Sequence, residues 1–365
     1  MIASRPQRET APPPPAERLP FVSVIVPVRN EARFIRHTLD QLLGQDYDPE
    51  RFEILVADGE STDETPALVR EAARRHRHVR LLSNPGRWSS AGRNVAVRAA
   101  RGDILVVVDG HCELDNRNYL RDLADAFARS GAECVGRPQP LDVAGATPLQ
   151  RAIAAARASR LGHHPDSFIY SSAEQFVRPQ SVAVAYRRSV FDAVGLFDED
   201  FDACEDVEFN HRVERAGFRC FFTPRVRARY YPRATLAGLF LQMLRYGRGR
   251  VRLLRKHPDT FSLPCFVPAA FVLGLAVGPA LALAMPWLGA AYLGVLALYA
   301  LIVLLGSAAI AVRTRDLRLL PWLPLVFATV HGGAGAGILR ELLLGHRRRE
   351  RVSARAVPAS RRSAA

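Results

Sequence analysis

Short apolar runs alternate with segments of helical periodicity over residues 21–110. Between the runs, apolar side chains recur at the spacing of one helix face, as in the helical pattern that opens at Asn30 and continues through Ile35, Leu39 and Leu42. Strands that are apolar along their length are expected where helices cover both faces of a parallel sheet. The pattern therefore predicts an α/β fold with a Rossmann-like, mostly parallel and doubly wound sheet. The runs with strand length are residues 21–26, 52–57, 78–82 and 103–108.

Helix signals support the same rhythm, although it becomes less regular after residue 110. Residues Ser61 to Glu64 match a capping box, which predicts a helix from there to about residue 75. We expect the later elements to pack against the same sheet and to complete one domain over residues 21–230. The polar, proline-rich residues 1–20 are interpreted as a disordered lead. The further predicted elements are a helix at 89–100, a strand at 182–186, a helix at 205–216 and a strand at 218–222.

The chain changes character at Cys265. Residues 265–285 and 287–312 contain no charged side chain, and each run reaches the ~20 residues that a membrane-spanning helix needs. Pro286 and Gly289 predict a tight turn between the two runs. A possible third span, residues 319–339, is a weaker candidate because it contains two prolines, a histidine and many glycines. Among these glycines, Gly333 and Gly337 have the G-x-x-x-G spacing that predicts close helix packing. A pair of buried helices in a soluble core is the alternative, which the length of the runs disfavours.

The basic residues gather beside these apolar runs. The formal net charge is +14, and Lys256 is the single lysine among 50 basic residues. Basic side chains without any acid fill residues 225–256, where they would meet anionic lipid headgroups, so we expect a membrane surface and no nucleic acid as partner. Arginines on both flanks of the hairpin place both of its ends in the cytosol. The predicted organisation is a basic interfacial segment 231–264, a membrane region 265–345 and a basic disordered tail 346–365.

Polar side chains directly after two of the strands are the first candidates for chemistry, because ligands of such sheets bind beyond the carboxyl ends of the strands. Asp58 follows the second strand and can accept hydrogen bonds from a base or ribose, although it could also belong to an ordinary turn. Asp109 and His111 follow the fourth strand and together can bind one divalent ion that also holds a diphosphate. Mg²⁺ prefers oxygen ligands, whereas an imidazole suits Mn²⁺ better.

Two later motifs complete the set of candidates. Glu205 and Asp206 lie at the predicted start of a helix, where a carboxylate could act as general base on a hydroxyl. Gln242, Arg245 and Tyr246 lie in a basic amphipathic stretch just before the first span. This stretch could be a purely interfacial helix, and these three side chains could in addition close over a diphosphate and an acceptor.

Taken in order, these motifs resemble the catalytic series of the family 2 glycosyltransferases. The likeness covers about residues 21–250. The run of residues 245–250, followed by a C-terminal hairpin, is most similar to the succinoglycan-type exopolysaccharide transferases within that family. The matching motifs are residues 26–31, 58–63, 91–94, 109–111, 195–199, 205–206 and 242–246.

The resemblance implies a GT-A fold and an inverting sugar transfer. It implies that Asp58 contacts the nucleotide base, that Asp109 and His111 hold the metal diphosphate, and that Asp206 is the catalytic base. The residues implied to line the donor pocket are Pro27, Asn30, Glu31 and Arg93, and those on the acceptor side are Glu205, Gln242, Arg245 and Tyr246.

Three departures from the family pattern matter. The usual Asp-Asp-Gly-Ser motif lacks its second acid, since Gly59 follows Asp58. The metal motif Asp-x-Asp has His111 in its last position, which leaves the identity of the metal open. The Gln-x-x-Arg-Trp gate of processive synthases has Tyr246 in place of tryptophan, which weakens the case for an enzyme that extrudes a polymer.

The resulting hypothesis is a multi-pass plasma-membrane enzyme with a cytosolic catalytic domain. It would use Mn²⁺ or Mg²⁺ to move a sugar from a UDP-sugar to a lipid-linked glycan acceptor, in exopolysaccharide or cell-envelope synthesis. A small processive synthase and a non-catalytic, membrane-tethered protein that binds nucleotide sugars remain the alternatives.

Overall fold

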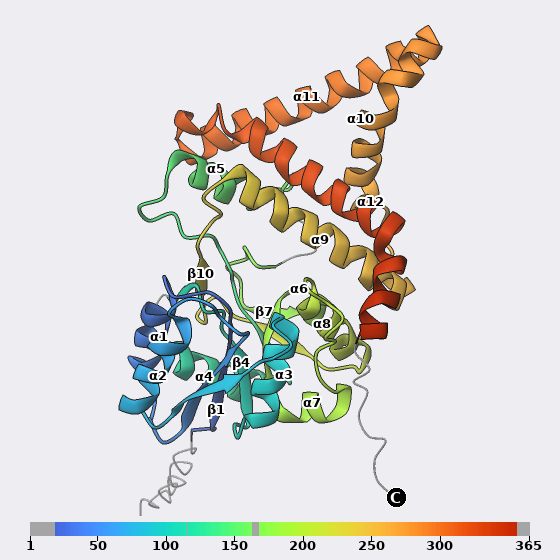
Figure 1. The fold of residues 1–365 in the computed structure, drawn as a ribbon. Helices are drawn as coiled ribbons and strands as arrows, with labels where there is room; N and C mark the ends of the chain where they lie inside the picture. Colours follow the sequence, from blue (N-terminus) through green and yellow to red (C-terminus); the bar gives the residue numbers. More distant parts are fainter. Residues whose placement is uncertain (1–18, 115, 163–167, 356–365) are drawn as a thin grey trace, which may run out of the picture.

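The structure is a computed structural model that describes residues 19–114, 116–162 and 168–355. Most of the predicted lead 1–20 and the end of the predicted tail, 356–365, lie outside the described residues. A mixed α/β domain carries a layer of long helices at one end (Figure 1). The strands are β1 (Val22–Val28), β2 (Phe52–Asp58), β3 (Val79–Ser83), β4 (Ile104–Val107), β5 (Cys112–Leu114), β6 (Cys134–Gly136), β7 (Gln175–Val177), β8 (Ala183–Arg187), β9 (Cys220–Phe222) and β10 (Ala228–Tyr230).

The helices fall into those that cover the sheet and those of the layer above it. Helices α1–α4 and α6–α8 are α1 (Ile35–Leu43), α2 (Thr65–Arg75), α3 (Ser89–Ala99), α4 (Tyr119–Ser130), α6 (Pro179–Val182), α7 (Arg188–Val194) and α8 (Glu205–Arg215). The remaining helices are α5 (Pro148–Arg157), α9 (Leu236–Lys256), η1 (Pro258–Thr260), η2 (Leu263–Phe266), α10 (Val267–Ala284), α11 (Pro286–Thr314), η3 (Leu317–Leu319) and α12 (Leu323–Arg355).

The main sheet has eight strands in the order β3-β2-β1-β4-β8-β6-β9-β7. Strands β3, β2, β1 and β4 are mutually parallel, β8 runs antiparallel to β4, and β6 runs antiparallel to β8. Strand β6 therefore has the same direction as β4. The carboxyl ends of β1, β2, β4 and β6 lie at one edge of the sheet, which is where a ligand site is expected.

Both faces of the sheet are buried, as the apolar strands predict. Helices α1, α2 and α4 cover one face, where Ile35, Val69 and Phe127 pack against alternate residues of β1 and β2. Helices α3, α7 and α8 cover the other face through side chains such as Val97 and Phe209. The predicted α/β class and doubly wound, mostly parallel sheet are confirmed.

Two predicted helix starts differ from the structure. The helix expected from Asn30 begins at Ile35, because Asn30 adopts a left-handed backbone (φ 55°) that does not continue into a helix. The capping box at Ser61–Glu64 is not formed. Ser61 accepts a hydrogen bond from the backbone of Asn30 instead, and the carboxylate of Asp63 accepts one from the amide of Thr65.

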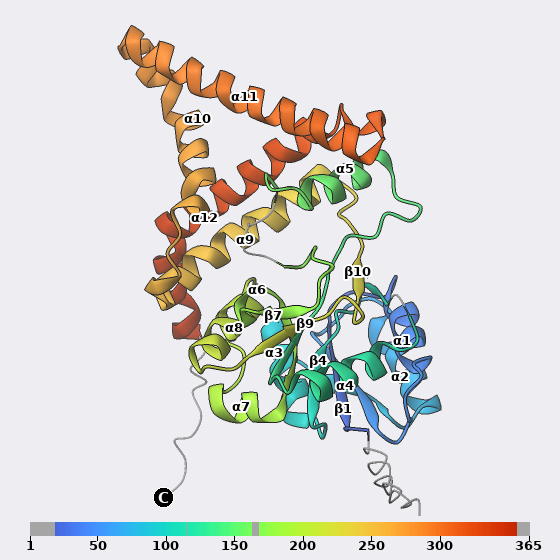
Figure 2. The same cartoon turned by 180° about the vertical axis from the view of Figure 1, so that it is seen from behind.

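Helices α9 and α12 lie side by side in the layer above the sheet domain (Figures 1 and 2). Glycines allow the close approach. A Cβ at Gly247 of α9 would lie 2.2 Å from the carbonyl oxygen of Ala334, and a Cβ at Gly337 of α12 would lie 2.1 Å from that of Leu244. The close helix packing expected from the G-x-x-x-G spacing of Gly333 and Gly337 is thus confirmed.

An ion-pair cluster joins the same two helices. The buried carboxylate of Glu341 on α12 accepts hydrogen bonds from Arg248 (3.1 Å) and Arg252 (2.9 Å) of α9. The Arg252 guanidinium also contacts the carboxylate of Asp202 at 2.7 Å, in the loop before α8. The basic stretch expected at the membrane interface therefore also fastens α9 to α12 and to the sheet domain.

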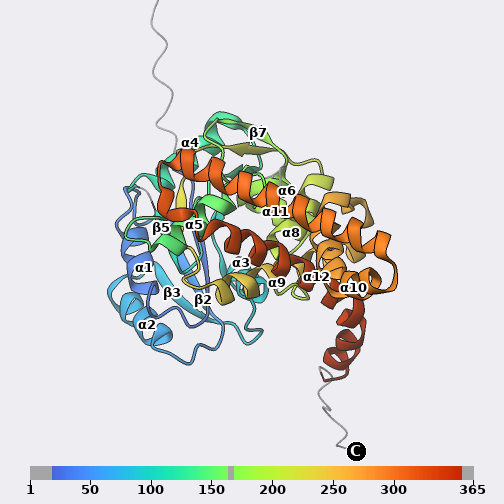
Figure 3. The same ribbon diagram turned by 90° about the horizontal axis from the view of Figure 1, so that it is seen from above.

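Among the described residues, two helices are long and apolar enough to cross a membrane, residues Leu263–Ala284 and Pro286–Thr314. They diverge from the turn at Met285, so Pro286 is the first residue of α11 and Gly289 lies inside that helix, not in the turn (Figure 3 shows this layer from above). The possible third span 319–339 falls in η3 and the first part of α12, where Val326 and Phe327 are buried. Its membrane crossing stays a prediction.

We expect Gly337→Ala to separate α9 from α12. The added methyl group would overlap the Leu244 carbonyl, and overpacking of this kind costs about 1–3 kcal/mol, more than the ~1 kcal/mol that alanine gains in helix propensity. The melting temperature of the detergent-solubilised protein should fall. Gly294→Ala in α11, where a Cβ meets nothing within 4 Å, is the matched control and should melt at or above the wild-type temperature.

Candidate functional site

A cleft opens at the carboxyl ends of β4 and β6, next to the start of α8. It is a polar cleft with both acidic and basic side chains in its wall. Its lining brings together Arg93, Asp109 and Asp206, which lie far apart in the sequence. The lining residues are Arg93, Val107, Asp109, Arg137, Gln139, Ala183, Val184, Tyr186, Asp206 and Tyr230.

Arg93 links the two acidic parts of the cleft. Its buried guanidinium lies 3.9 Å from the Asp109 carboxylate and 3.4 Å from that of Glu205, and it stacks over the ring of Phe197 at 5.3 Å. Burial lowers the pKa of Arg93, but Glu205 and Asp109 more than offset this and raise it, so the side chain stays charged. Its Nε has no hydrogen-bond partner among the described residues and is available to a ligand.

The neighbouring motif fixes the position of α3, which carries Arg93. Asn94 and Phe197 exchange two hydrogen bonds: the Asn94 amide donates to the Phe197 carbonyl (2.8 Å), and the Phe197 backbone amide donates to Asn94 Oδ1 (2.9 Å). The predicted motifs 91–94 and 195–199 therefore meet in space. They hold α3 against the loop before α8.

His111 is held by Glu31 rather than by Asp109. Its Nδ1 lies 2.9 Å from Glu31 Oε1, which leaves Nε2 as the ring nitrogen available to an ion. Burial lowers the pKa of His111, but the hydrogen bond and charge of Glu31 outweigh it and raise the pKa. Metal-ligating histidines commonly present their second nitrogen to a carboxylate in this way. The donor set of the Asp109 carboxylate and the His111 imidazole fits a divalent ion such as Mn²⁺.

Asn30 and Asp58 shape the loop after β2. Asn30 Oδ1 accepts a hydrogen bond from the backbone amide of Thr62 (2.8 Å), so this side chain holds the loop instead of facing the cleft. Asp58 Oδ2 accepts one from the amide of Ser61 (3.1 Å), whereas its Oδ1 is buried with no partner in the described part of the chain. Pro27 packs 3.2 Å from the Cβ position of Gly92 and thereby seats α3 on the sheet.

The two carboxylates at the start of α8 have different surroundings. Glu205 is buried against Arg93, and burial raises its pKa, although Arg93 lowers it. Asp206 is exposed and lines the cleft, and its Oδ1 lies 2.9 Å from the amide of Val207. Asp206 is therefore the carboxylate that an acceptor can reach, and Glu205 holds Arg93.

The predicted gate residues lie on α9, beside the loop before α8. Gln242 donates to the hydroxyl of Tyr246 (3.3 Å), and Arg245 donates to the carbonyl of Asp202 (2.5 Å). The Arg157 guanidinium of α5 lies 6.0 Å from the ring centre of Tyr246. The gate residues thus contact the segment that leads into Glu205 and Asp206, but they do not line the cleft itself.

Arg137 is a cleft residue that the sequence analysis missed. Its guanidinium is fully buried and donates to the Tyr230 hydroxyl (3.1 Å) and the Val107 carbonyl (3.4 Å). Its Nε and Nη1 have no hydrogen-bond partner in the described ranges, and no carboxylate there pairs with it. A buried, unpaired charge costs several kcal/mol, which an anionic ligand would offset. The position of Arg137 directly after β6 would have marked it as a site residue, but β6 is too short a strand to be recognised from the sequence.

Comparison with known proteins supports one family. The family model for glycosyl transferase family 2 matches residues 23–195, and that for glycosyl transferase family group 2 matches residues 116–314. The succinoglycan biosynthesis protein ExoA of Rhizobium meliloti is 33% identical over 274 residues, which cover 74% of this chain and 81% of that protein. The dolichyl N-acetyl-α-D-glucosaminyl phosphate 3-β-D-2,3-diacetamido-2,3-dideoxy-β-D-glucuronosyltransferase of Methanococcus voltae is 24% identical, over 89% of this chain and 98% of the other.

Solved structures show the same fold. The mannosyltransferase PcManGT from Pyrobaculum calidifontis, in complex with GDP-Man and Mn²⁺, superposes with a TM-score of 0.54 at 25% identity and covers 89% of this chain and 88% of its own. Residues 1–349 of TarS from S. aureus, in complex with UDP-GlcNAc, superpose with a TM-score of 0.50 at 17% identity, over 88% and 92% of the two chains. The GT-A fold is thereby confirmed.

Replacing Arg137 by methionine should leave the ligand-free protein as stable as the wild type or more stable. A buried charge without a counter-ion is costly to desolvate, and an apolar side chain of similar size removes that cost. The same variant should lose the rise in melting temperature that an anionic ligand gives the wild type. Thermal unfolding with and without a nucleoside diphosphate measures both effects. A strong destabilisation of the ligand-free variant would show that Arg137 is structural.

Proposed function

The chain belongs to the family 2 glycosyltransferases, and we propose that it is an inverting enzyme that transfers a sugar to a lipid-linked glycan acceptor at the cytosolic membrane face. Glycosyltransferase activity in polysaccharide or glycan synthesis is common to its relatives. The single observation that carries the finer proposal is the cleft itself, where Asp109 and Arg137 meet the exposed Asp206. The cleft brings groups that can bind a diphosphate close to a carboxylate that can act as the base.

The donor we propose is a UDP-sugar. Asp58 has one buried carboxylate oxygen, Oδ1, that lacks a partner among the described residues, while Oδ2 is occupied by the Ser61 amide. One free acceptor matches the single N–H on the edge of uracil, whereas guanine presents two donors side by side. The loop of residues 58–63 would then hold the base, with Asn30 keeping the loop in place.

The diphosphate would lie beside Asp109, His111 and the two buried arginines. A bound Mn²⁺ or Mg²⁺ would neutralise charge on the leaving diphosphate. Asp109 and His111 Nε2 would hold that ion, and Glu31 would orient the imidazole. Arg93 Nε and Arg137 Nη1, both without partners in the described chain, would donate to anionic oxygens. Such donors need no rearrangement when charge develops, which is the basis of electrostatic catalysis.

Asp206 is the proposed general base. An acceptor hydroxyl is a weak nucleophile until its proton is removed, and the exposed carboxylate at the first turn of α8 is placed to accept that proton. Glu205 is buried and paired with Arg93, which makes it the second candidate. Inversion follows when the hydroxyl attacks from the side opposite the diphosphate in one displacement.

The layer of α9–α12 would hold the acceptor and the enzyme at the membrane. Helices α10 and α11 expose apolar side chains along their length, including Leu283 (90% exposed), as helices in lipid do. Helix α9 lies in this layer above the sheet domain, where Arg248 and Arg252 pair with Glu341 and Asp202 (Figure 1). A lipid-linked acceptor would therefore reach Asp206 from the side of Tyr246 and Arg157. The protein would be a multi-pass membrane protein with its catalytic domain in the cytosol.

We expect Asp206→Asn and Asp109→Asn to separate catalysis from donor binding. Asp206→Asn keeps the shape but removes the base, so transfer should fall ~10²–10⁴-fold while donor affinity changes little. Asp109→Asn should instead weaken metal-dependent donor binding. Donor titration calorimetry and a transfer assay on both variants provide the measurement. Transfer by Asp206→Asn within a few-fold of the wild type would place the base elsewhere, with Glu205 next in line.

The nucleotide preference tests the proposed role of Asp58. In the presence of Mn²⁺, UDP should bind at least tenfold more tightly than GDP, which corresponds to ~1.4 kcal/mol. Asp58→Ala should weaken UDP binding by ~10–100-fold, because a hydrogen bond to a charged group contributes about 1.5–3 kcal/mol. Asp40→Ala, an exposed acid on α1, is the control and should bind as the wild type does. Tighter binding of GDP than of UDP would contradict the UDP assignment. Undiminished UDP binding in excess chelator would contradict the role of a metal ion in donor binding.

A further inference from the structure

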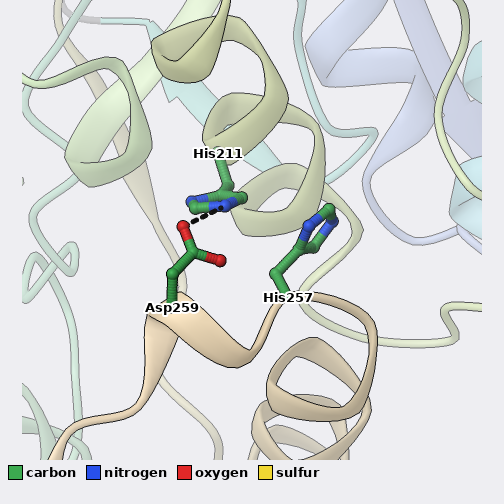
Figure 4. A group of neighbouring side chains, drawn as sticks. All are labelled: His211, His257 and Asp259. Atoms are coloured by element: carbon green, nitrogen blue, oxygen red, sulfur yellow. Dashed lines mark ion pairs between the residues drawn. The ribbon is translucent and has the colours of Figure 1, made fainter.

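A second group of metal-ligand side chains lies away from the cleft, where the sheet domain meets the membrane-side helices. His211 comes from the second half of α8, His257 from the end of α9, and Asp259 from η1 (Figure 4). One potential ligand atom from each residue lies within 4.8 Å of the other two. The three side chains face one another, although no two are adjacent in the sequence (Figure 4).

His211 presents a buried ring nitrogen that lacks a hydrogen bond. The residue is 6% exposed, and its Nε2 lies 3.2 Å from Asp259 Oδ2 without hydrogen-bond geometry. Burial lowers the pKa of His211 and the charge of Asp259 raises it, with a net lowering. This buried ring nitrogen without a hydrogen bond is a candidate metal ligand.

His257 is oriented by a buried carboxylate. Its Nε2 lies 3.0 Å from Oε1 of Glu208, which is fully buried and also accepts hydrogen bonds from Arg212. Burial raises the pKa of Glu208, but the hydrogen bonds from Arg212, Lys256 and His257 outweigh it and lower the pKa to about 2. The ionised carboxylate requires a proton on His257 Nε2, which leaves the lone pair on Nδ1. This carboxylate–histidine arrangement is typical of metal-ligating histidines.

Asp259 supplies the mobile third ligand. Its side chain is 47% exposed and also contacts Arg215 at 3.1 Å, whose own side chain is 65% exposed. An exposed ion pair of this kind contributes only ~0–1 kcal/mol, so an ion can displace it. The charged groups around the three side chains are the acids Asp198, Glu208 and Glu214 and the bases Arg212, Arg215 and Lys256.

We propose that His211, His257 and Asp259 bind one divalent transition-metal ion of the zinc class. Two imidazoles and one carboxylate are ligands that Zn²⁺ takes at about 2.0–2.2 Å, with water in a fourth position. Ligand atoms that share such an ion lie no more than about 4.2 Å apart, so the exposed Asp259 side chain closes inward on binding. The site is separate from the cleft and does not depend on the proposed transfer reaction.

The place of the site suggests what the ion would do. Helix α8 begins with Glu205 and Asp206, and His211 lies further along the same helix. His257 and Asp259 belong to the connection between α9 and α10, the first candidate span. An ion held by all three would fasten the helix of the proposed base to the segment that leads into the membrane. It would act as a structural cross-link.

The test is metal binding by the full-length protein in detergent. The protein is stripped with a chelator, desalted and titrated with Co²⁺, whose visible absorption reports nitrogen and carboxylate ligands, and then with Zn²⁺, which displaces it. The wild type should bind one equivalent at this site. His211→Gln and His257→Gln should each weaken binding at least tenfold, and Asp259→Asn should do so with least effect on the fold.

Three controls separate this site from others. His37→Gln removes an exposed imidazole paired with Glu113 and should bind as the wild type does. Asp109→Asn removes the cleft ligand and should leave this equivalent in place. The circular dichroism spectrum of each metal-free variant shows whether it folds. The proposal would be overturned if His257→Gln and Asp259→Asn still bound the equivalent of metal. It would also be overturned if only Asp109→Asn lost that equivalent.

Discussion

The buried guanidinium of Arg93 holds the cleft together. It contacts Asp109 after β4 on one side and Glu205 at the start of α8 on the other, and it lies over the ring of Phe197. These three partners come from parts of the chain that fold as separate elements. With Arg93 removed, the Glu205 carboxylate would be buried without its counter-ion, a condition that typically costs 3–5 kcal/mol. The relative positions of the donor side and the acceptor side of the cleft depend on this one cation.

The parallel arrangement of the strands explains why such distant residues meet. Asp58, Asp109 and Arg137 each lie at or just after the carboxyl end of a strand, and all these ends lie at one edge of the sheet. Strand β8 lies between β4 and β6 and is antiparallel to both. Strands β4 and β6 therefore run in the same direction, and their carboxyl ends lie at the same edge.

Much of this could be predicted from the sequence, because the signals were local. The strands β1, β2 and β4 and helices α3 and α8 follow from apolar runs and helical spacing within a residue or two. The start of α1 could not be predicted, since the left-handed backbone of Asn30 depends on hydrogen bonds from a loop thirty residues later. The same holds for the pairing of His111 with Glu31, which replaces the expected partnership with Asp109 alone.

Arg137 and the histidine cluster were missed for a related reason. Strand β6 has three residues, too few for a periodic pattern, so nothing in the sequence placed Arg137 at the binding edge. His211 lies on α8 and His257 directly follows α9, so their approach depends on how the end of α9 docks on the sheet domain. Side-chain environments that arise from tertiary packing leave no trace in local periodicity. The acidic and metal-type motifs were visible because their members are neighbours in the chain.

Helix α9 is confined by glycines on two sides. Gly247 packs against the Ala334 carbonyl of α12, and Gly249 packs 2.8 Å, measured from its Cβ position, from the carbonyl of Ala203 just before Glu205. Backbone lies directly against backbone at both places, with no flexible side chain between them to absorb a displacement. A displacement of α12 would therefore move α9, and the start of α8 with it, as one rigid body. The position of the long helices thus becomes a mechanical input to the geometry of the cleft.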